Sequence, residues 1–435
     1  MAFVYAIVGT GRQGTAAAYD LALRGEASEI RLLDSDAGRV ATAARRLRSL
    51  LASRSGAPAG PVLKTVPCDV RDGRALAGAL AGSHAALSGL PYHLNVGAAR
   101  AAIEARCHFN DLGGNTSVVR ETLALDKEAR RAGVSIVPDC GLAPGMCQTL
   151  AVYAMSRIEN PRHVRIRCGG LPQVPRPPLG YRIVFSVAGL TNEYTGTAVC
   201  LRKGRVTELP AFTEPEEIEF PMPVGKCEAF LTSGGTSTAP WTFAGKIDTY
   251  DYKTVRYKGH YDRVRCLIDL GFLGTEPVLL PSGNVVPREL THELFERHLA
   301  FPEDTDLVIL RVECFGDARK KRTAAGAKTA RAAAERVTAA RRGKTARPAA
   351  RARAPIATAR DNTPAYRIDL LDFHDPATGF SAMERTTAFP AAIVTSMQAA
   401  GTVRPGARPV ETAVPAEPFV RLLDRRGFKI VHARL

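Results

Sequence analysis

Six residues near the start of the chain form a glycine-rich turn after an apolar run at 3–8 and before an alanine-rich stretch at 15–23. They are Gly9, Thr10, Gly11, Arg12, Gln13 and Gly14. The first glycine permits a tight bend, the second lets the backbone approach a pyrophosphate, and the third lets the helix pack on the strand. The phosphates would lie at the helix N-terminus, whose N–H groups favour an anion. We therefore predict that these six residues bind a dinucleotide.

Asp34 ends the next apolar run, 30–33, and stands twenty residues after Gly14. A carboxylate at this position accepts hydrogen bonds from the adenosine ribose and repels a 2′-phosphate. We therefore expect NAD. Arg31 and Arg39 are near Asp34 in sequence and leave NADP as the less favoured alternative.

These residues need a parallel sheet to position them. From residue 3 to about residue 138, short apolar runs alternate with helical stretches, which predicts an α/β fold with a doubly wound Rossmann sheet. Ligands of such sheets bind at the carboxyl ends of the strands. The segments predicted at that edge are 9–14, Asp34, Asp69, 88–92, 111–115 and 139–145.

Two of these segments receive a specific interpretation. Asp69 is expected near the adenine, with a helix N-cap as an equal alternative. Ser88, Leu90 and Pro91 are expected along the ribose and the nicotinamide, although Pro91 also suits a purely loop-shaping role.

The second half of the chain has a different pattern. Several runs alternate with period two, which predicts an α+β domain with a mainly antiparallel sheet. We expect 307–314 to pair with 366–373, and 380–387 to form a further strand. The predicted domains are a Rossmann domain at 1–145, completed by 388–435, and an α+β domain for substrate and dimerisation at 146–387.

The charge of the chain is unevenly distributed. The 435 residues carry a net charge of +16, but residues 318–360 hold 14 Lys and Arg against a single acid, Glu335. The rest of the chain is close to neutral. Residues 318–361 lack apolar periodicity, which predicts a disordered basic insertion. A polyanion-binding or nucleic-acid-binding arm is the less favoured reading, since no aromatic residue is available to stack on bases.

Cysteine content and the N-terminus bear on the compartment. Nine scattered cysteines without a C-x-x-C pair favour reduced thiols and give no metal site. The N-terminus has no basic region or cleavage site, and no apolar run is long enough to span a membrane. We expect a cytoplasmic protein.

Several longer motifs resemble those of the saccharopine dehydrogenase family, and within it those of bacterial lysine 6-dehydrogenases and their saccharopine-dehydrogenase-like relatives. The segments that carry the resemblance are 87–95, 108–116, 137–146, 169–172, 184–186, 231–238, 252–257 with 259–260, and 383–389. The match runs almost end to end, except for the basic insertion. The resemblance implies hydride transfer between a nicotinamide and a carbon that bears an amine, and it implies a homodimer or larger homo-oligomer.

The resemblance also implies roles for individual residues. Arg256, in the segment Lys-Thr-Val-Arg-Tyr, corresponds to a clamp for the substrate carboxylate, and Thr386 and Thr387 correspond to an active-site threonine pair. Cys140 falls where the family contacts nicotinamide and substrate. Asp111, at the end of a strand, suits holding the substrate ammonium or a proton, with a turn or N-cap carboxylate as the alternative. Arg256 also suits a surface position, and the threonines also suit a strand.

The sequence therefore predicts an NAD-dependent oxidoreductase acting on the CH–NH group of an amino acid, either lysine 6-dehydrogenase-like or saccharopine dehydrogenase-like. The alternatives are a polyamine-forming dehydrogenase of the same fold and a non-catalytic nucleotide-binding protein with a polyanion-binding arm. No membrane partner is expected. Nucleic acid is a less favoured partner and would be bound only through residues 318–360.

Overall fold

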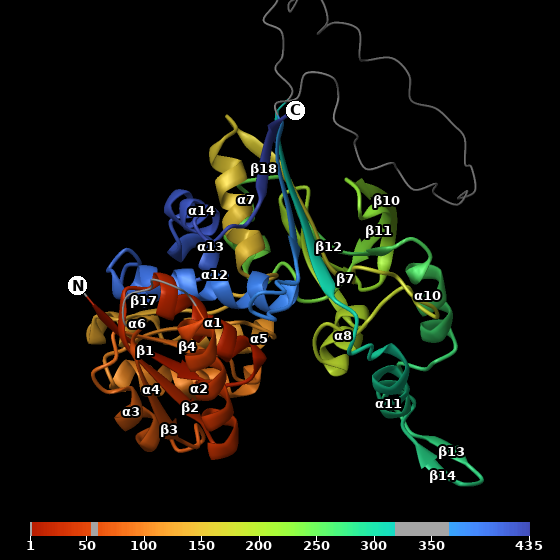
Figure 1. Ribbon diagram of the computed structural model, residues 1–435. Coiled ribbons are helices and arrows are strands. Elements are labelled where there is room, and N and C mark those ends of the chain that lie inside the picture. The colour runs from red at the N-terminus through yellow and green to blue at the C-terminus, as the bar shows by residue number, and fades with distance from the viewer. Residues whose placement is uncertain (1, 54–59, 318–364) are drawn as a thin grey trace, which may run out of the picture.

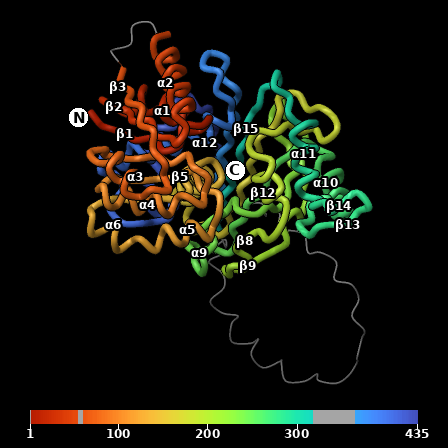
Figure 2. Tube along the Cα trace, turned by 90° about the horizontal axis from the view of Figure 1, so that it is seen from below, coloured from red at the N-terminus to blue at the C-terminus, as the bar shows by residue number. Residues whose placement is uncertain are grey.

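The computed structural model describes residues 2–53, 60–317 and 365–435. Its described strands form two large sheets and a small hairpin. Both views show the half built from the first 137 residues lying beside the half that carries the second sheet (Figures 1 and 2). The predicted insertion at 318–361 lies outside the described residues, between β15 and β16 in the sequence.

The first sheet has seven strands within the described residues, in the order β17-β6-β5-β4-β1-β2-β3, and every pair is parallel. Its strands are β1 (Phe3–Val8), β2 (Ala27–Asp34), β3 (Val62–Pro67), β4 (Ala85–Ser88), β5 (His108–Asp111), β6 (Ser135–Val137) and β17 (Gly406–Ala407). The chain order reverses between β1 and β4, which is the switch point where a doubly wound sheet binds its ligand. The predicted Rossmann fold is confirmed.

Helices link these strands, and their starts follow ordinary capping chemistry. Asp36, Asp72 and Asn115 each cap a helix by accepting from two backbone N–H groups. The helices are α1 (Arg12–Arg24), α2 (Ala37–Ala52), α3 (Gly73–Leu80), α4 (Asn95–Glu104), α5 (Thr116–Leu123) and α6 (Asp126–Ala132), with a short 3₁₀ turn η1 (Tyr92–Leu94). α7 (Met146–Ser156) then leads into the second half.

The second sheet has nine strands among the described residues and is mainly antiparallel, with one parallel pair between β7 and β12. Its strands are β7 (Pro161–Pro172), β8 (Thr197–Arg202), β9 (Arg205–Pro210), β10 (Thr213–Phe220), β11 (Gly225–Leu231), β12 (Thr249–Tyr257), β15 (Asp306–Gly316), β16 (Ala365–Phe373) and β18 (Ile430–Arg434). β15 pairs with β16 from Leu307 opposite Phe373, as predicted.

Shorter elements surround this sheet. The helices are α8 (Val187–Tyr194), α9 (Ala239–Phe243), α10 (His260–Asp269) and α11 (Pro287–Leu299), and β13 (Val278–Leu280) pairs with β14 (Gly283–Val285). α11 and this hairpin project from the second half in Figure 1. No helix among the described residues is both long enough and apolar enough to cross a membrane.

The predicted strand at 380–387 is wrong. Ser381 caps α12 (Ala382–Ala399), where the Ser381 side chain accepts from the Glu384 N–H and the Glu384 side chain accepts from the Ser381 N–H. This reciprocal capping box starts a helix rather than a strand. Thr386 and Thr387 therefore lie on a helix.

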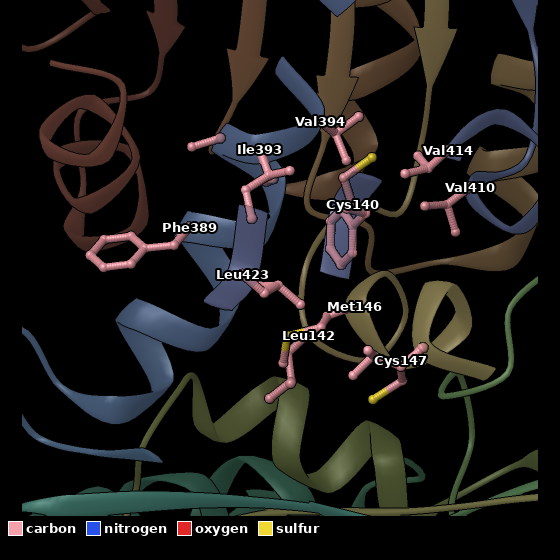
Figure 3. Close-up of a cluster of buried hydrophobic side chains, with 14 of the residues drawn as sticks. Cys140, Leu142, Met146, Cys147, Phe389, Ile393, Val394, Val410, Val414 and Leu423 are labelled. Carbon is pink, nitrogen blue, oxygen red and sulfur yellow. The ribbon is translucent and has the colours of Figure 1, made fainter. Parts of the chain in front are cut away.

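The C-terminal segments contribute to both halves. α12 packs against α1, β4 and β5, and β17 adds to the first sheet, whereas β18 adds to the second. α13 (Val410–Ala413) and α14 (Ala416–Asp424) pack on α7. Figure 3 shows Val394 of α12, Val410 and Leu423 gathered with the start of α7 in one apolar cluster. The two halves thus share a continuous core.

Candidate active site

The glycine turn has the geometry of a phosphate cradle. Gly9 has a φ of +92°, and a Cβ on Gly14 would lie 1.9 Å from the carbonyl oxygen of Gly9, so the packing requires glycine at position 14. A Cβ on Gly11 would meet nothing within 4 Å, and Gly11 caps α1 without a side-chain hydrogen bond. Open space beside an uncapped helix N-terminus fits a pyrophosphate. Gln13 Oε1 is buried without a partner among the described residues, a group that a bound cofactor can satisfy.

Asp34 is directed into the protein. Its Oδ2 accepts from the Thr10 N–H at 2.9 Å and from Thr10 Oγ1 at 3.2 Å, and its Oδ1 accepts from the Asp36 N–H at 3.1 Å. The side chain is almost completely buried. Arg39 Nη1 lies 3.8 Å from Asp34 Oδ1 and is largely exposed. The carboxylate is therefore already hydrogen-bonded, with a guanidinium beside it.

Asp69 follows β3 and is exposed. Arg71 donates to both of its carboxylate oxygens, at 2.6 Å from Nη2 to Oδ2, and this contact lowers the pKa of Asp69 to about 2. Asp72, not Asp69, caps α3, so the N-cap alternative for Asp69 is wrong. Its place near the adenine stays a prediction.

The segment after β4 lies against the glycine turn. Ser88 is buried and donates to Asn95 Oδ1 at 2.8 Å, and a Cβ on Gly9 would lie 3.2 Å from Leu90 Cδ2. Pro91 is exposed and precedes η1. The fold thus brings Ser88 and Leu90 to the cofactor edge.

Cys140 is part of the apolar core. It follows β6, is buried, and its thiol donates to the Val137 carbonyl at 3.3 Å. Figure 3 shows it among the side chains of the apolar cluster around Val394. Burial, with the nearby charges of Asp111 and Asp139, raises the pKa of this thiol well above its usual value, so it stays protonated.

A cavity of about 410 Å³ lies where the carboxyl edge of the first sheet meets the second half. Its walls come from the turn after β5, the loop after β6, the start of α8, and the segment after β11. The lining residues that carry ionisable groups are Tyr92, Asp139, Glu193 and Tyr252. No Lys, Arg or His is among the described residues that line it.

Two aspartates meet beside this cavity. Asp111 Oδ1 accepts from the N–H of Gly113 at 2.8 Å and from that of Asp139 at 3.1 Å. Burial raises the pKa of Asp111 to about 6, although these two N–H groups lower it. Asp139 lines the cavity and accepts from Ser237 Oγ. Asp111 is thus a turn carboxylate that supports the loop of Asp139. Sequence reasoning assigned no role to Asp139, and its place after β6 was the available signal.

Arg256 is fully buried and lies behind the cavity wall. Its Nε donates to the Tyr194 hydroxyl at 3.0 Å, Nη1 donates to the Val255 carbonyl, and Nη2 lies 3.7 Å from Glu193 Oε2. The guanidinium also lies 4.6 Å from the ring centre of Tyr181. The surface reading of Arg256 is therefore wrong. Glu193 connects it to the cavity, and burial raises the pKa of Glu193 to about 7 against the opposing effect of Arg256.

The two predicted threonines differ. Thr386 is completely buried, and its Oγ1 donates to the Ala382 carbonyl at 2.7 Å within α12. Thr387 faces the loop after β6, since a Cβ on Gly141 would lie 3.4 Å from its Cγ2. Thr387 is therefore the member of the pair nearer to the cavity loop.

These features define a dinucleotide-binding α/β protein with a ligand cavity at the edge of its Rossmann sheet. Two family models cover most of the chain: "Saccharopine dehydrogenase NADP binding domain" matches residues 5–137, and "Saccharopine dehydrogenase C-terminal domain" matches residues 141–428. The chain belongs to the saccharopine dehydrogenase family, as the sequence motifs predicted.

Curated relatives agree with this assignment. Saccharopine dehydrogenase [NADP(+), L-glutamate-forming] from Pyricularia oryzae is 26% identical over 279 residues, which cover 60% of this chain and 60% of that protein. The enzyme of the same name from Schizosaccharomyces pombe is 24% identical over 275 residues, with the same coverage. The chain thus matches about 60% of the length of these relatives.

Solved structures share the fold. The apo saccharopine dehydrogenase (L-Glu forming) from Saccharomyces cerevisiae superposes with a TM-score of 0.72 at 16% identity and covers all of both chains. The homospermidine synthase from Legionella pneumophila, solved with NAD, gives a TM-score of 0.60 at 11% identity, covering all of this chain and 92% of that one.

The prediction of NAD, with NADP less favoured, is wrong. The family model over residues 5–137 is described as NADP-binding, and the curated relatives from three fungi carry NADP(+) in their names. The physical reason lies at Asp34, whose oxygens are taken up by Thr10 and Asp36. Arg39 beside this carboxylate offsets its negative charge, so Asp34 repels a 2′-phosphate less than an isolated carboxylate would.

Proposed function

We propose that this chain is an NADP-dependent oxidoreductase that acts on the CH–NH group of an amino acid, with saccharopine-type chemistry as the first candidate. The observation that supports it most directly is the cavity at the carboxyl edge of β5 and β6, where a doubly wound sheet holds the nicotinamide half of its cofactor. A bound nicotinamide supplies the hydride acceptor or donor. The protein has to orient the substrate carbon and exclude water.

Arg39 is the group that we propose to bind the 2′-phosphate of NADP. It lies at the start of α2, directly after the ribose-binding end of β2, and it is largely exposed. Arg31, the other base near Asp34 in sequence, is engaged by Glu29 and by the carbonyl oxygens of Ala79 and Ala81. Arg39 is thus better placed than Arg31.

Arg256 and Thr387 are proposed substrate groups. Arg256 lies behind Glu193 in the cavity wall, with Nη2 3.7 Å from Glu193 Oε2, so a substrate carboxylate reaches it where the Glu193 side chain moves aside. Such a pairing is charge-assisted and directional. Thr387 would support the same ligand from α12 across Gly141.

A lysine 6-dehydrogenase-like activity is the second candidate. The described lining of the cavity contains the carboxylates of Asp139 and Glu193 and no basic side chain. Such a wall suits a substrate with an ammonium group more than one with three carboxylates. Saccharopine has three carboxylates, whereas lysine has one.

A substrate panel tests the proposal. Saccharopine and lysine are offered with NADP or NAD, and reduced nicotinamide is followed by absorbance. Turnover of saccharopine with NADP supports the first candidate, and turnover of lysine alone supports the second. Absence of turnover with every amine would reject the proposed function.

The domain limits remain a proposal. We propose cofactor binding by 1–145 with 388–435 and substrate binding by 146–387, with β18 as an exception because it pairs with the second sheet. A homo-oligomer also remains a proposal, tested by light scattering of the purified chain.

A further inference from the structure

Asp139 is held in an uncommon backbone conformation at the cavity. It directly follows β6 and Pro138, and its φ of +62° lies in the left-handed region, which Asp tolerates better than most residues. Gly113 makes room for it, because a Cβ on Gly113 would lie 2.3 Å from Asp139 Oδ1. Gly113 itself has a φ of +86°. Two unusual backbone positions thus place this carboxylate.

The two oxygens of Asp139 have different surroundings. Oδ2 accepts from Ser237 Oγ, which comes from the segment after β11. Oδ1 is buried and has no hydrogen-bond partner among the described residues. Asp139 also lines the cavity. A buried carboxylate oxygen without a donor is costly when the group is ionised, so this environment favours uptake of a proton by Asp139.

Two other buried aspartates have protein donors on both carboxylate oxygens. Asp20 receives two hydrogen bonds from Arg426, and Asp306 receives one on each oxygen from the N–H groups of Ala382 and Met383. These residues show what a structural carboxylate looks like in this fold. Asp139 differs from them through its unpartnered Oδ1 and its place in the cavity wall.

We propose that Asp139 is the catalytic base of the proposed reaction. This inference rests on the proposed function. The carboxylate removes a proton from the substrate ammonium and becomes a carboxylic acid. The nitrogen lone pair then forms the C=N bond while the hydride leaves the same carbon for the oxidised nicotinamide, which gives an iminium. In the reverse direction the acid returns its proton to the nitrogen.

Ser237 is the positioning residue for this carboxylate. Its hydroxyl donates to Oδ2, and both residues line the cavity, so this hydrogen bond fixes the carboxylate in the cavity wall. The ionisable groups around Asp139 are Asp111 on β5, Glu411 on α13, and Glu193 and Tyr252 across the cavity. Burial, then the charges of Asp111 and Glu411, raise the pKa of Asp139 well above its usual value, and the Ser237 hydrogen bond lowers it. A raised pKa favours the carboxylic acid that forms when Asp139 takes up a proton.

Asp139→Asn tests the proposal, with Asp424→Asn, exposed at the end of α14, as the matched control. We expect Asp139→Asn to lower kcat by ~100-fold or more, while NADPH binding, followed by fluorescence, is unchanged. The control should retain full activity. Turnover within about threefold of the wild type would overturn the proposal. If the wild type turns over no amine, the proposed function fails instead.

Thermal stability gives a second readout that does not depend on activity. Because the folded pKa of Asp139 is raised, its ionisation destabilises the folded state, and this cost grows as pH rises through that pKa. Asp139→Asn removes this cost, so the Tm of the variant should equal or exceed that of the wild type at pH ~8. At pH ~5 the difference in Tm between the variant and the wild type should be smaller. A Tm below the wild type at both values would identify a structural carboxylate and overturn the proposal.

Ser237→Ala provides a variant with a milder change. Loss of the hydrogen bond to Oδ2 should raise the pKa of Asp139, so the acid limb of the kcat/KM profile should move to higher pH by about one unit. The acid limb of the profile reports the titration of Asp111 and Asp139 as a coupled pair, and not that of one residue. An acid limb at the wild-type position would overturn the assignment.

Discussion

Replacement of Arg39 by alanine tests the cofactor assignment most directly. Arg39 is 59% exposed, so an ion pair with a 2′-phosphate would be partly screened by water. A charge-assisted hydrogen bond in such a position contributes about 1–2 kcal/mol. Since about 1.4 kcal/mol corresponds to a tenfold change, KM for NADP should rise about five- to thirtyfold. KM for NAD, which lacks the phosphate, should change little.

The assay compares initial rates with NADP and NAD at saturating substrate. Arg45→Ala is the matched control, because Arg45 is an exposed arginine on the same helix and its removal changes the net charge equally. A second series at high salt should shrink the effect of Arg39→Ala, since salt screens exposed charges. An unchanged KM for NADP in Arg39→Ala, or an equal change for both cofactors, would refute the assignment of Arg39.

Three further predictions concern the rest of the site. Gly14→Ala should abolish NADPH fluorescence enhancement, because its Cβ would lie 1.9 Å from the Gly9 carbonyl oxygen; retained binding would contradict the packing argument. Arg256→Lys should raise the substrate KM ~10-fold or more and leave the cofactor KM unchanged, since an ammonium cannot keep the contacts to Tyr194 and Val255 while offering a further N–H to the substrate; an unaltered substrate KM would exclude the clamp. Thr387→Val should lower kcat/KM several-fold, whereas Thr386→Val, whose hydroxyl serves only Ala382, should stay near wild-type kinetics; equal losses in both would show that α12 acts only structurally.

The fold was predictable where local patterns carry the information. The turn at 9–14 and the alternation of strands and helices depend on residues close in sequence, and the pairing of 307–314 with 366–373 depends on two clear β patterns. The segment 380–387 shows the limit of this approach. We expected a strand there, whereas the capping box formed by Ser381 and Glu384 determines a helix.

The site was only partly predictable, because its chemistry depends on contacts between distant segments. Asp139 stands out as a candidate base only because Ser237, ninety-eight positions away, donates to it and because Gly113 leaves space for its carboxylate. Asp34 shows a related limit. The sequence rule recognises a carboxylate after β2 but does not report its direction, and here Thr10 of the glycine turn takes up one of its oxygens. The rule therefore selected the wrong cofactor.

α12 contacts both the glycine turn and the loop that lines the cavity. At its start, Glu384 accepts from Arg12 of the glycine turn at 2.8 Å. Within the next turn Thr387 faces Gly141 of the cavity loop. Further along the helix, Thr395 accepts a hydrogen bond from Asn110 of β5, the residue before Asp111. A shift of this helix would therefore move both ligand sites at once. Because interiors are close-packed, such a shift would propagate to both sites rather than be absorbed locally. One helix far from the N-terminus in sequence thus connects the glycine turn to the cavity loop.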